Sequence, residues 1–366
     1  MHGKMETFKE IFSFLMDHAK THHFVLIIDE FQDFFSINPS VFSDLQCIWD
    51  LNKNNTKMHL VFIGSIYSMM HKIFEDSKEP LFGRADRIIQ LQPFTIPQMQ
   101  EILLDYNIKD LNTLFDFYVI TGGVPKYLDW ILNNQCKTFD DILDFIARDN
   151  SPFLNEGRNQ LITEFGKDYM IYFSVLELIS RGKTSSSEIE SIIRKNVSAY
   201  LDNLDTVYSI VKKLKPIDAK PNAKLQKYYL VDNFLQFWFR FISRNREAVE
   251  IQNFAFIKTL IKRFYDSYKG RLLEKFFKEI LALTGNYNRI GSYWEKGHQN
   301  EIDIVAFNDL DKIVLLSEVK FNKHKNSQKR LEHRAINLVS KYPDYNVQYK
   351  LLSLENAKEY LDAQSG

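Results

Sequence analysis

The chain has 366 residues, of which 45% are hydrophobic, and its 47 lysines and arginines balance 47 aspartates and glutamates. This length predicts two or three domains, and the zero formal charge excludes a global field that attracts nucleic acid, so any basic surface must be local. The two cysteines, Cys47 and Cys136, make neither a zinc pattern nor a disulfide framework. No apolar run reaches the about 20 residues of a membrane-spanning helix, and no signal-peptide core follows Met1. We therefore expect a cytoplasmic protein without a membrane partner.

The most informative stretch of the first part is residues 24–31, Phe-Val-Leu-Ile-Ile-Asp-Glu-Phe. Five apolar residues end in two carboxylates, which predicts a strand buried on both faces of a parallel sheet. Open α/β sheets bind ligands at this end of their strands. The form is that of a Walker B strand, in which Asp29 would hold Mg²⁺ and Glu30 would polarise the attacking water. The alternative is a core strand that runs into an acidic surface loop.

Other elements of a parallel sheet surround this strand. The spacing of apolar residues predicts helices at residues 7–19 and 41–51. A second buried strand is predicted at residues 59–65, where it ends in a glycine and a serine, and a third at residues 88–91. Strands that alternate with helices indicate a parallel α/β sheet.

Five short motifs follow one another in a fixed order: Asp29-Glu30, Gly64-Ser65, Leu81-Phe-Gly-Arg84 with Arg87, Leu91-Gln-Pro-Phe94, and Thr121-Gly-Gly-Val-Pro125-Lys-Tyr127-Leu128. This order resembles the second half of an AAA-type ATPase and its helical lid. More narrowly, it is similar to the ATPases common in archaea and some bacteria that carry a C-terminal domain of unknown function.

The resemblance implies ATP as a ligand and a nucleotide site. Its residues would be Asp29, Glu30, Ser65, Arg84 and Arg87. Ser65 would be the sensor of the γ-phosphate, and Arg84 or Arg87 a charge-stabilising finger; for the two arginines a plain surface or ion-pair role is the alternative. The family also implies a homo-oligomer, since AAA-type domains often form rings.

The chain departs from the family at the phosphate-binding loop. The motif G-x-x-x-x-G-K-[ST] should lie tens of residues before the Walker B strand, but only 23 residues precede Phe24, and Gly3-Lys4 is followed by Met5. Without backbone N–H groups and a lysine to hold the phosphates, carboxylates alone would repel ATP. The sequence thus resembles an ATPase without its phosphate-binding half, and we expect weak or absent ATP binding by this polypeptide alone.

The middle of the chain predicts a winged helix-turn-helix. Helices are expected at residues 167–180, from an N-cap within residues 184–187 to about Lys195, and at residues 199–213 with Ser198 as the cap. A polar stretch and a strand at residues 228–231 follow, and this segment also resembles the same ATPase family. The aromatic residues between 234 and 241 are predicted to be core.

The third helix of such a fold can enter the major groove of double-stranded DNA, while basic wing residues contact phosphates. The candidate DNA-binding residues are Lys195, Ser198, Lys212, Lys213, Lys215 and Lys224. Asp202 and Asp205 on the exposed side of that helix disfavour base recognition. The alternative is a winged helix that packs against other domains.

The last part of the chain carries alternating apolar and acidic residues on two predicted strands, Glu301–Ala306 and Val314–Phe321, after helices at residues 254–268 and from Gly270. If the strands pair, Asp303, Glu318 and Lys320 come together. The pattern resembles a PD-(D/E)XK nuclease core, with Glu274 as the extra carboxylate. Asp303 and Glu318 would hold Mg²⁺, and Lys320 would orient or activate water against the scissile phosphate. Glu274 joins Lys320 as a catalytic candidate through the resemblance. The alternative is a cross-strand ion pair without catalysis.

Together these patterns predict a multi-domain α/β protein. Its parts are a partial P-loop-type ATPase core with a parallel sheet at residues 1–95, a helical lid at 96–150, a winged helix at 165–245, and a restriction-endonuclease-like α/β domain at 250–366. Three hypotheses follow: a DNA-acting ATPase-family protein with a metal-dependent endonuclease, a non-catalytic DNA-binding or regulatory module with vestigial sites, and an assembly protein that does not bind DNA.

Overall fold

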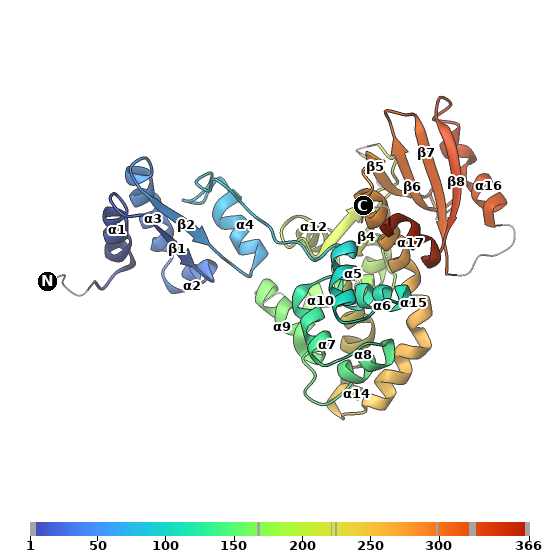
Figure 1. Ribbon diagram of the computed structural model, residues 1–366, viewed down its shortest axis with the longest axis horizontal. Coiled ribbons are helices and arrows are strands. Elements are labelled where there is room, and N and C mark those ends of the chain that lie inside the picture. Colours follow the sequence, from blue (N-terminus) through green and yellow to red (C-terminus); the bar gives the residue numbers. More distant parts are fainter. Residues whose placement is uncertain are drawn as a thin grey trace. The chain divides into compact units, whose positions relative to one another are not determined.

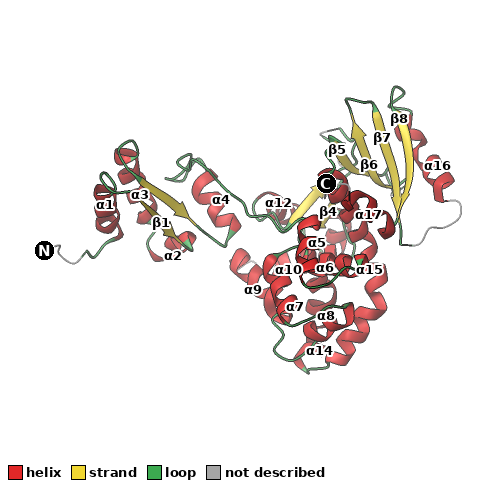
Figure 2. Cartoon of the chain, in the orientation of Figure 1, coloured by secondary structure: helices red, strands yellow, loops and turns green. Residues whose placement is uncertain are grey.

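The computed structural model describes residues 5–166, 169–220, 222–223, 225–297, 299–321 and 327–362. They form a mixed α/β protein that is mostly helical and includes a small parallel sheet (Figures 1 and 2). The chain divides into two compact units, one of residues 1–91 and 162–166, the other of residues 92–161 and 167–366. No helix in the described ranges combines the length and apolarity that crossing a bilayer requires.

The first unit contains a two-stranded parallel sheet, in which β1 (Phe24–Ile28) pairs with β2 (Met58–Phe62). Helices α1 (Phe8–His18), α3 (Ser40–Asn52) and α4 (Tyr67–Glu75) accompany it, with a short 3₁₀ turn (Phe31–Asp33) and α2 (Phe34–Ile37) after β1. Thr7 begins α1 with a capping box to Glu10, which satisfies backbone N–H groups of the first turn. The two predicted helices and the first two predicted strands are thereby confirmed.

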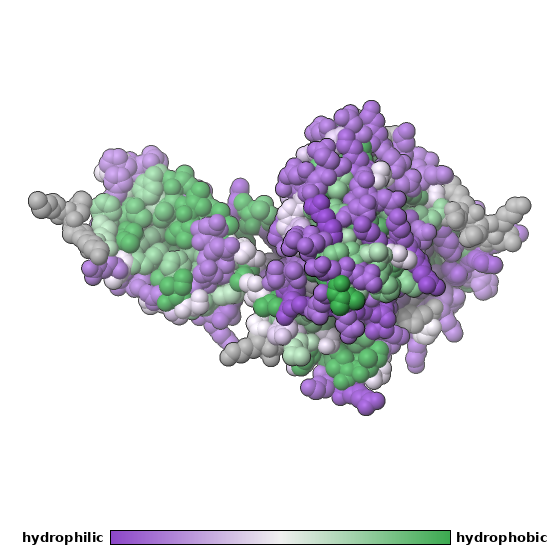
Figure 3. Space-filling model, turned by 90° about the horizontal axis from the view of Figure 1, so that it is seen from below, coloured by the Kyte–Doolittle hydropathy of each residue, from purple (hydrophilic) through white to green (hydrophobic). Residues whose placement is uncertain are grey.

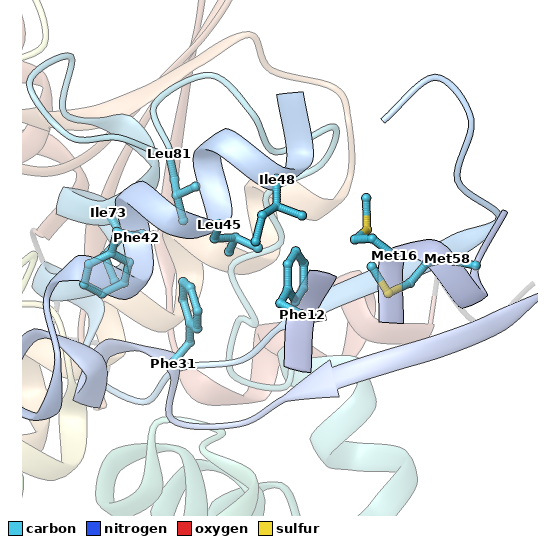
Figure 4. Packing of buried hydrophobic residues seen from close by; sticks show 10 residues of the cluster. Phe12, Met16, Phe31, Phe42, Leu45, Ile48, Met58, Ile73 and Leu81 are labelled. Carbon is cyan, nitrogen blue, oxygen red and sulfur yellow. The ribbon is translucent and has the colours of Figure 1, made fainter. Parts of the chain in front are cut away.

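An aromatic and aliphatic core lies between this sheet and its helices (Figure 4). Phe31, at the start of the 3₁₀ turn, is fully buried, and its ring stacks on Phe62 with 4.0 Å between centroids. Phe42 meets the same ring edge-on at 5.4 Å. The residue that follows the two carboxylates therefore anchors them to the core.

The opposite face of β1 is not covered by the described residues of this unit. Val25 and Ile27 are 59% and 58% exposed, and Figure 3 shows hydrophobic surface on the unit. The prediction of a strand buried on both faces is wrong here, because a second layer over Val25 and Ile27 is needed to bury them and the described residues of this unit supply helices on the other face only.

The third strand predicted at residues 88–91 is also wrong. These residues have no regular structure, and Ile88, Ile89 and Leu91 are 56%, 73% and 89% exposed. An apolar run becomes a strand only when a neighbouring strand accepts and donates its backbone hydrogen bonds. Among the described residues, no strand pairs with this segment.

The second unit begins with a helical bundle of α5 (Ile96–Asp105), α6 (Leu111–Thr121), α7 (Pro125–Asn133), α8 (Phe139–Ile146) and α9 (Phe153–Phe165), the last helix crossing into residues of the first unit. Gly122 ends α6 in the left-handed conformation. At Gly123, a Cβ would lie 2.2 Å from the carbonyl oxygen of Phe94, whose N–H donates to the Gly123 carbonyl. The Gly-Gly-Val-Pro run therefore forms the tight turn between α6 and α7.

Three helices and an antiparallel hairpin follow, in the predicted order: α10 (Tyr169–Ser180), α11 (Ser186–Ile193), α12 (Ser198–Thr206), β3 (Val211–Leu214) and β4 (Lys227–Leu230). Ser185 caps α11 with Glu188, as the sequence predicts. Two details of the prediction for the third helix are wrong. Its N-cap is Val197 rather than Ser198, and the helix ends at Thr206 because Ser209 has a φ of 54° and Val211 onward pairs with β4.

A short helix α13 (Asn233–Phe237), a π-helical turn (Trp238–Ile242), a 3₁₀ turn (Ser243–Asn245) and α14 (Arg246–Glu250) lead into α15 (Phe254–Leu283). The sequence predicts a helix break near Gly270, but α15 runs through it. A mid-helix glycine costs only about 1 kcal/mol, and Leu272, Leu273, Phe276 and Phe277 beyond it are buried. Their burial exceeds that cost.

The C-terminal sheet has the order β5 (Arg289–Tyr293), β6 (Ile302–Asn308), β7 (Ile313–Val319) and β8 (Asn346–Leu352), antiparallel except for the parallel β7–β8 pair. Helix α16 (Ser327–Val339) packs on it through Leu331, Ala335 and Leu338, and α17 (Leu354–Asp362) follows β8. The predicted pairing of β6 with β7 is confirmed. The finer division into lid, winged helix and nuclease-like domain stays a prediction.

A buried carboxyl group joins α6 to α15. The Tyr265 hydroxyl donates to Asp116 Oδ1 at 2.8 Å, and burial raises the pKa of Asp116 to about 6. The folded protein thus holds this proton more tightly than the unfolded chain. Its charge is a destabilising contribution that is absent below about pH 4, grows between pH 4 and pH 6 and then levels off.

The Asp116→Asn variant keeps an acceptor for Tyr265 but has no carboxyl group to ionise. As pH rises from 4 to 7, we expect its free energy of unfolding to fall by about 2 kcal/mol less than that of the wild type. Urea unfolding at the two pH values measures this difference. Asp105→Asn, on the exposed side of α5, is the control and should keep the wild-type pH profile. An Asp116→Asn profile parallel to the wild type would contradict the assignment.

Candidate functional site

A pocket of about 840 Å³ in the second unit is lined by residues from α15, β6, the end of β7 and α16. Asp303, Glu318 and Lys320 line it, as does Glu274. The structure thus places the predicted Asp303, Glu318 and Lys320, and the predicted extra carboxylate Glu274, at one pocket. Their predicted chemical roles stay predictions.

The register of the sheet explains why the carboxylates meet. Ile304 lies opposite Ser317 in the antiparallel β6–β7 pair, so the preceding Asp303 comes level with Glu318. Asp303 Oδ2 accepts a hydrogen bond from the Val319 N–H at 2.8 Å, and the Lys320 N–H donates to the Leu352 carbonyl at 2.9 Å. The backbone of the β7 end is thus held on both sides.

Glu318 is the most deeply buried of these side chains, with 5% of the residue exposed. Its Oε1 atom accepts from the Lys320 ammonium and, at 3.4 Å, from the Arg334 guanidinium. Its Oε2 atom is buried without a hydrogen-bond partner among the described residues. A buried carboxylate oxygen without a partner is costly, and a cation in the pocket would satisfy it.

The pocket's electrostatics favour an added positive charge. Burial, followed by the Asp303 charge, raises the pKa of Glu274 to about 8. Burial also raises the pKa of Asp303, against the lowering effect of the Val319 N–H bond. Burial lowers the pKa of the nearby Lys278 ammonium, whose Nζ donates to Ser292 Oγ at 2.6 Å.

Sequence reasoning missed several charged residues at this pocket. Arg271 and Lys278 lie three residues before and four after Glu274 on α15, a helical spacing that could have revealed them. Lys227 of β4, only 6% exposed, pairs with Glu301 at 2.7 Å and lies over the Trp294 ring at 4.6 Å. No local signal in the sequence joins Lys227 or Arg334 to the pocket, because they are 74 and 33 residues from Glu301.

The donor set fits a hard cation held by two carboxylates. In the described part of the chain, no three or more His, Cys, Asp or Glu side chains are placed together so as to hold a metal ion. Asp303 and the unpartnered oxygen of Glu318 are the two side-chain ligands on offer, and Mg²⁺ commonly takes one or two carboxylates and keeps several waters. The residues present therefore fit such an ion.

Three of the predicted nucleotide residues, Asp29, Glu30 and Ser65, follow the C-terminal ends of β1 and β2. Glu30 has a φ of 49°, and its Oε2 accepts from Ser65 Oγ at 2.7 Å and from Gln32 Nε2 at 2.5 Å. The Gln32 and Ser65 bonds lower the pKa of the exposed Glu30. Asp29 is exposed beside it and accepts the Glu30 N–H. The structure thus places Asp29, Glu30 and Ser65 after two adjacent strands, with Glu30 in contact with Ser65. Their role in nucleotide binding stays a prediction.

The two candidate arginine fingers differ. Arg84 makes a two-pronged ion pair with Asp50, at 2.7 Å from Nη2 to Oδ2, and also donates to the carbonyls of Pro80 and Phe82. This geometry matches the ion-pair alternative, because the guanidinium donors are already engaged. Arg87 is exposed.

The candidate DNA-binding residues are dispersed. Lys195, Ser198 and Lys212 are exposed, whereas Lys215 is half-buried. Lys213 pairs with Asp202 of α12 at 2.9 Å, so part of the predicted wing charge is neutralised by the helix beside it. Lys224 lies outside the described residues.

The fold and the pocket define a mixed α/β protein with a carboxylate-lined pocket at the edge of its larger sheet. An uncharacterized protein of Methanocaldococcus jannaschii is 30% identical over 365 residues, which cover 97% of this chain and 77% of that protein. The chain belongs to the same family as this archaeal protein. Residues 238–331 match DUF234, a family described as archaea bacterial proteins of unknown function.

Two further similarities are more limited. A second uncharacterized protein of Methanocaldococcus jannaschii is 36% identical over 67 residues, 18% of this chain and 65% of that protein. A solved structure, the Walker-type ATPase of Pyrococcus abyssi, aligns with a TM-score of 0.47 and 16% identity over 64% of this chain and 68% of that chain.

Proposed function

We propose that the pocket of the second unit hydrolyses phosphodiester bonds of double-stranded DNA with the help of Mg²⁺. The observation that carries this proposal is Glu318, whose buried Oε2 has no partner among the described residues and which adjoins Asp303 across the β6–β7 pair. A restriction-endonuclease-like architecture for residues 250–366 agrees with the order of a helix carrying Glu274, then strands carrying Asp303, Glu318 and Lys320.

Asp303 and Glu318 would hold the cation, which when bound supplies Lewis-acid polarisation of the phosphate and a more acidic water. Lys320, already paired with Glu318, would orient the attacking water. Arg271 and Arg334 line the same pocket, and each can donate paired hydrogen bonds to phosphate oxygens. Glu274, whose buried side chain keeps its proton near neutral pH, would donate to the leaving oxygen.

The other parts of the chain take supporting roles in this proposal. The three helices and hairpin of residues 165–245 act as a winged helix beside the pocket, since Lys227 of the hairpin pairs with Glu301 at its rim. Contact with DNA there rests on the exposed Lys195 and Lys212 rather than on α12, which carries Asp202 and Asp205. This pattern favours backbone contact over base recognition.

The contact between Glu30 and Ser65 favours a second candidate function, nucleotide binding by an AAA-type core in the first unit. An acidic residue bonded to a polar residue that follows the neighbouring strand is an arrangement suited to a Mg²⁺-bound phosphate. The printed sequence contains no G-x-x-x-x-G-K-[ST] motif, so we expect this chain alone to bind ATP weakly. Equilibrium dialysis with ATP and Mg²⁺ tests this candidate.

Nicking of supercoiled plasmid with Mg²⁺ or Mn²⁺ tests the main proposal. We expect Lys320→Ala to reduce the rate by at least about 100-fold, because one fixed charge at the reacting group contributes that much or more. Lys358→Ala, an exposed lysine of α17 outside the pocket, is the matched control and should nick at the wild-type rate.

The possible outcomes separate the three hypotheses. Nicking that Lys320→Ala leaves unchanged contradicts the assignment of the pocket. Salt-sensitive duplex binding without cleavage favours a DNA-binding module, since phosphate contacts weaken as salt rises. Absence of duplex binding at low salt favours the assembly protein.

A further inference from the structure

A second cavity in the second unit, of about 620 Å³, lies between α9, α10, the π-helical turn and α14. Its interior is aromatic and aliphatic, with Tyr169, Phe173 and Trp238 among the lining residues. Arg158, Arg246 and Glu250 line it as well. Cavities of this size, mainly apolar and with few polar groups, are typical of small-molecule sites. It shares no lining residue with the carboxylate-lined pocket.

The back of the cavity is fixed. The Trp238 Nε1–H donates to the Leu154 carbonyl at 3.1 Å, and a Cβ on Gly157 would lie 2.4 Å from the Trp238 ring, so α9 can approach only because residue 157 is glycine. Trp238 also begins the π-helical turn. Single π turns are uncommon and occur often at functional sites. Trp238 and Ile242, the two ends of this turn, both line the cavity.

The charges at the cavity do not balance. The Arg246 Nε–H donates to Glu250 at 2.8 Å, so these two neutralise each other. Arg158 is only partly exposed, and no described residue provides it with an ion pair. One positive charge therefore remains, which matches a ligand with a single anionic group.

We infer that this cavity binds a nucleoside monophosphate. Its phosphate is held by the Arg158 guanidinium, and its base lies against the rings of Tyr169 and Phe173. Asn155 and Ser243, which also line the cavity, offer an amide and a hydroxyl to the sugar or to the base edge. Aromatic side chains stack on the face of any base. We therefore expect the cavity to recognise the presence of a base and a phosphate in one molecule, rather than one particular base.

Isothermal titration of the full chain with each of the four ribonucleoside monophosphates, with adenosine and with inorganic phosphate tests the inference. At least one monophosphate should bind more tightly than about 1 mM, and adenosine and phosphate alone should each bind at least 10-fold more weakly. Arg158→Gln should weaken monophosphate binding by about 10- to 100-fold, the range for a hydrogen bond to a charged group, while leaving adenosine binding unchanged.

Arg263→Gln, on the exposed side of α15, is the matched control and should bind like the wild type. Lys320→Ala should do so too, which keeps this inference separate from the proposed cleavage activity. Absence of binding by all four monophosphates overturns the inference. So does an Arg158→Gln variant with wild-type affinity, or inorganic phosphate that binds as tightly as the monophosphate.

Discussion

Replacing Glu318 with Gln is expected to abolish both metal binding and metal-dependent cleavage. The carboxylate has one oxygen on Lys320 and Arg334 and the other without a partner in the described structure. A neutral amide has neither the charge nor the second acceptor oxygen that a divalent ion needs. In the wild type, Mn²⁺ at about 100 times its dissociation constant should add about 2.7 kcal/mol to the free energy of unfolding.

Glu318→Gln should lose this metal-dependent stabilisation and nick plasmid at least about 100-fold more slowly. The variant leaves Lys320 and Arg334 without their buried anion, so it should also be less stable without metal. The informative measurement is therefore the difference between unfolding with and without Mn²⁺. Glu359→Gln, an exposed carboxylate of α17, is the control. A Glu318→Gln variant with the full Mn²⁺ effect would show that the ion binds elsewhere.

Phe31→Ala is expected to have the largest effect on stability in the first unit. The Phe31 side chain is fully buried and contacts the rings of Phe62, Phe42 and Phe34 at centroid distances of 4.0, 5.4 and 5.7 Å. Truncating such a residue removes buried apolar area and leaves a cavity, which together cost about 3–5 kcal/mol. Urea unfolding, followed by hydrogen exchange of residues 5–91, measures the loss and locates it.

Ile27→Ala is the matched comparison, four residues earlier on the exposed face of β1. Ile27 is 58% exposed, so its truncation should cost less than about 1 kcal/mol. An equal loss for the two variants would mean that the face carrying Ile27 is covered in solution. The pair of variants thus tests directly that only one face of this small sheet is packed.

How much of the molecule could be predicted differs between its sites. The alternation around Asp303, Glu318 and Lys320 predicted both strands and their shared face, because side chains alternate along any strand. Adjacent pairing then brought the three together, as the register shows. The capping boxes at Thr7 and Ser185 were equally accessible, since a cap depends on residues only three apart.

The wrong predictions share a different cause. The run at 88–91 is rich in strand-forming residues, but no described strand pairs with it. Gly270 is a typical helix-breaking residue, but it lies in a helix with buried residues beyond it. At 88–91, no distant strand supplied the backbone hydrogen bonds that a strand needs. At Gly270, packing against distant segments outweighed the local preference. Val25 and Ile27 are exposed for the same reason, since burial depends on what covers a face.

By itself, the sequence determined most of the periodic elements, the cap of α11 and the set of carboxylates and lysine on β6 and β7, because these depend on neighbours within a few residues. Only the tertiary structure decided that Arg334 lines the pocket, that Lys227 pairs with Glu301, and that Arg84 is held by Asp50. It also decided that one oxygen of Glu318 has no partner among the described residues. These facts depend on contacts between residues tens of positions apart, and no local pattern encodes such distances.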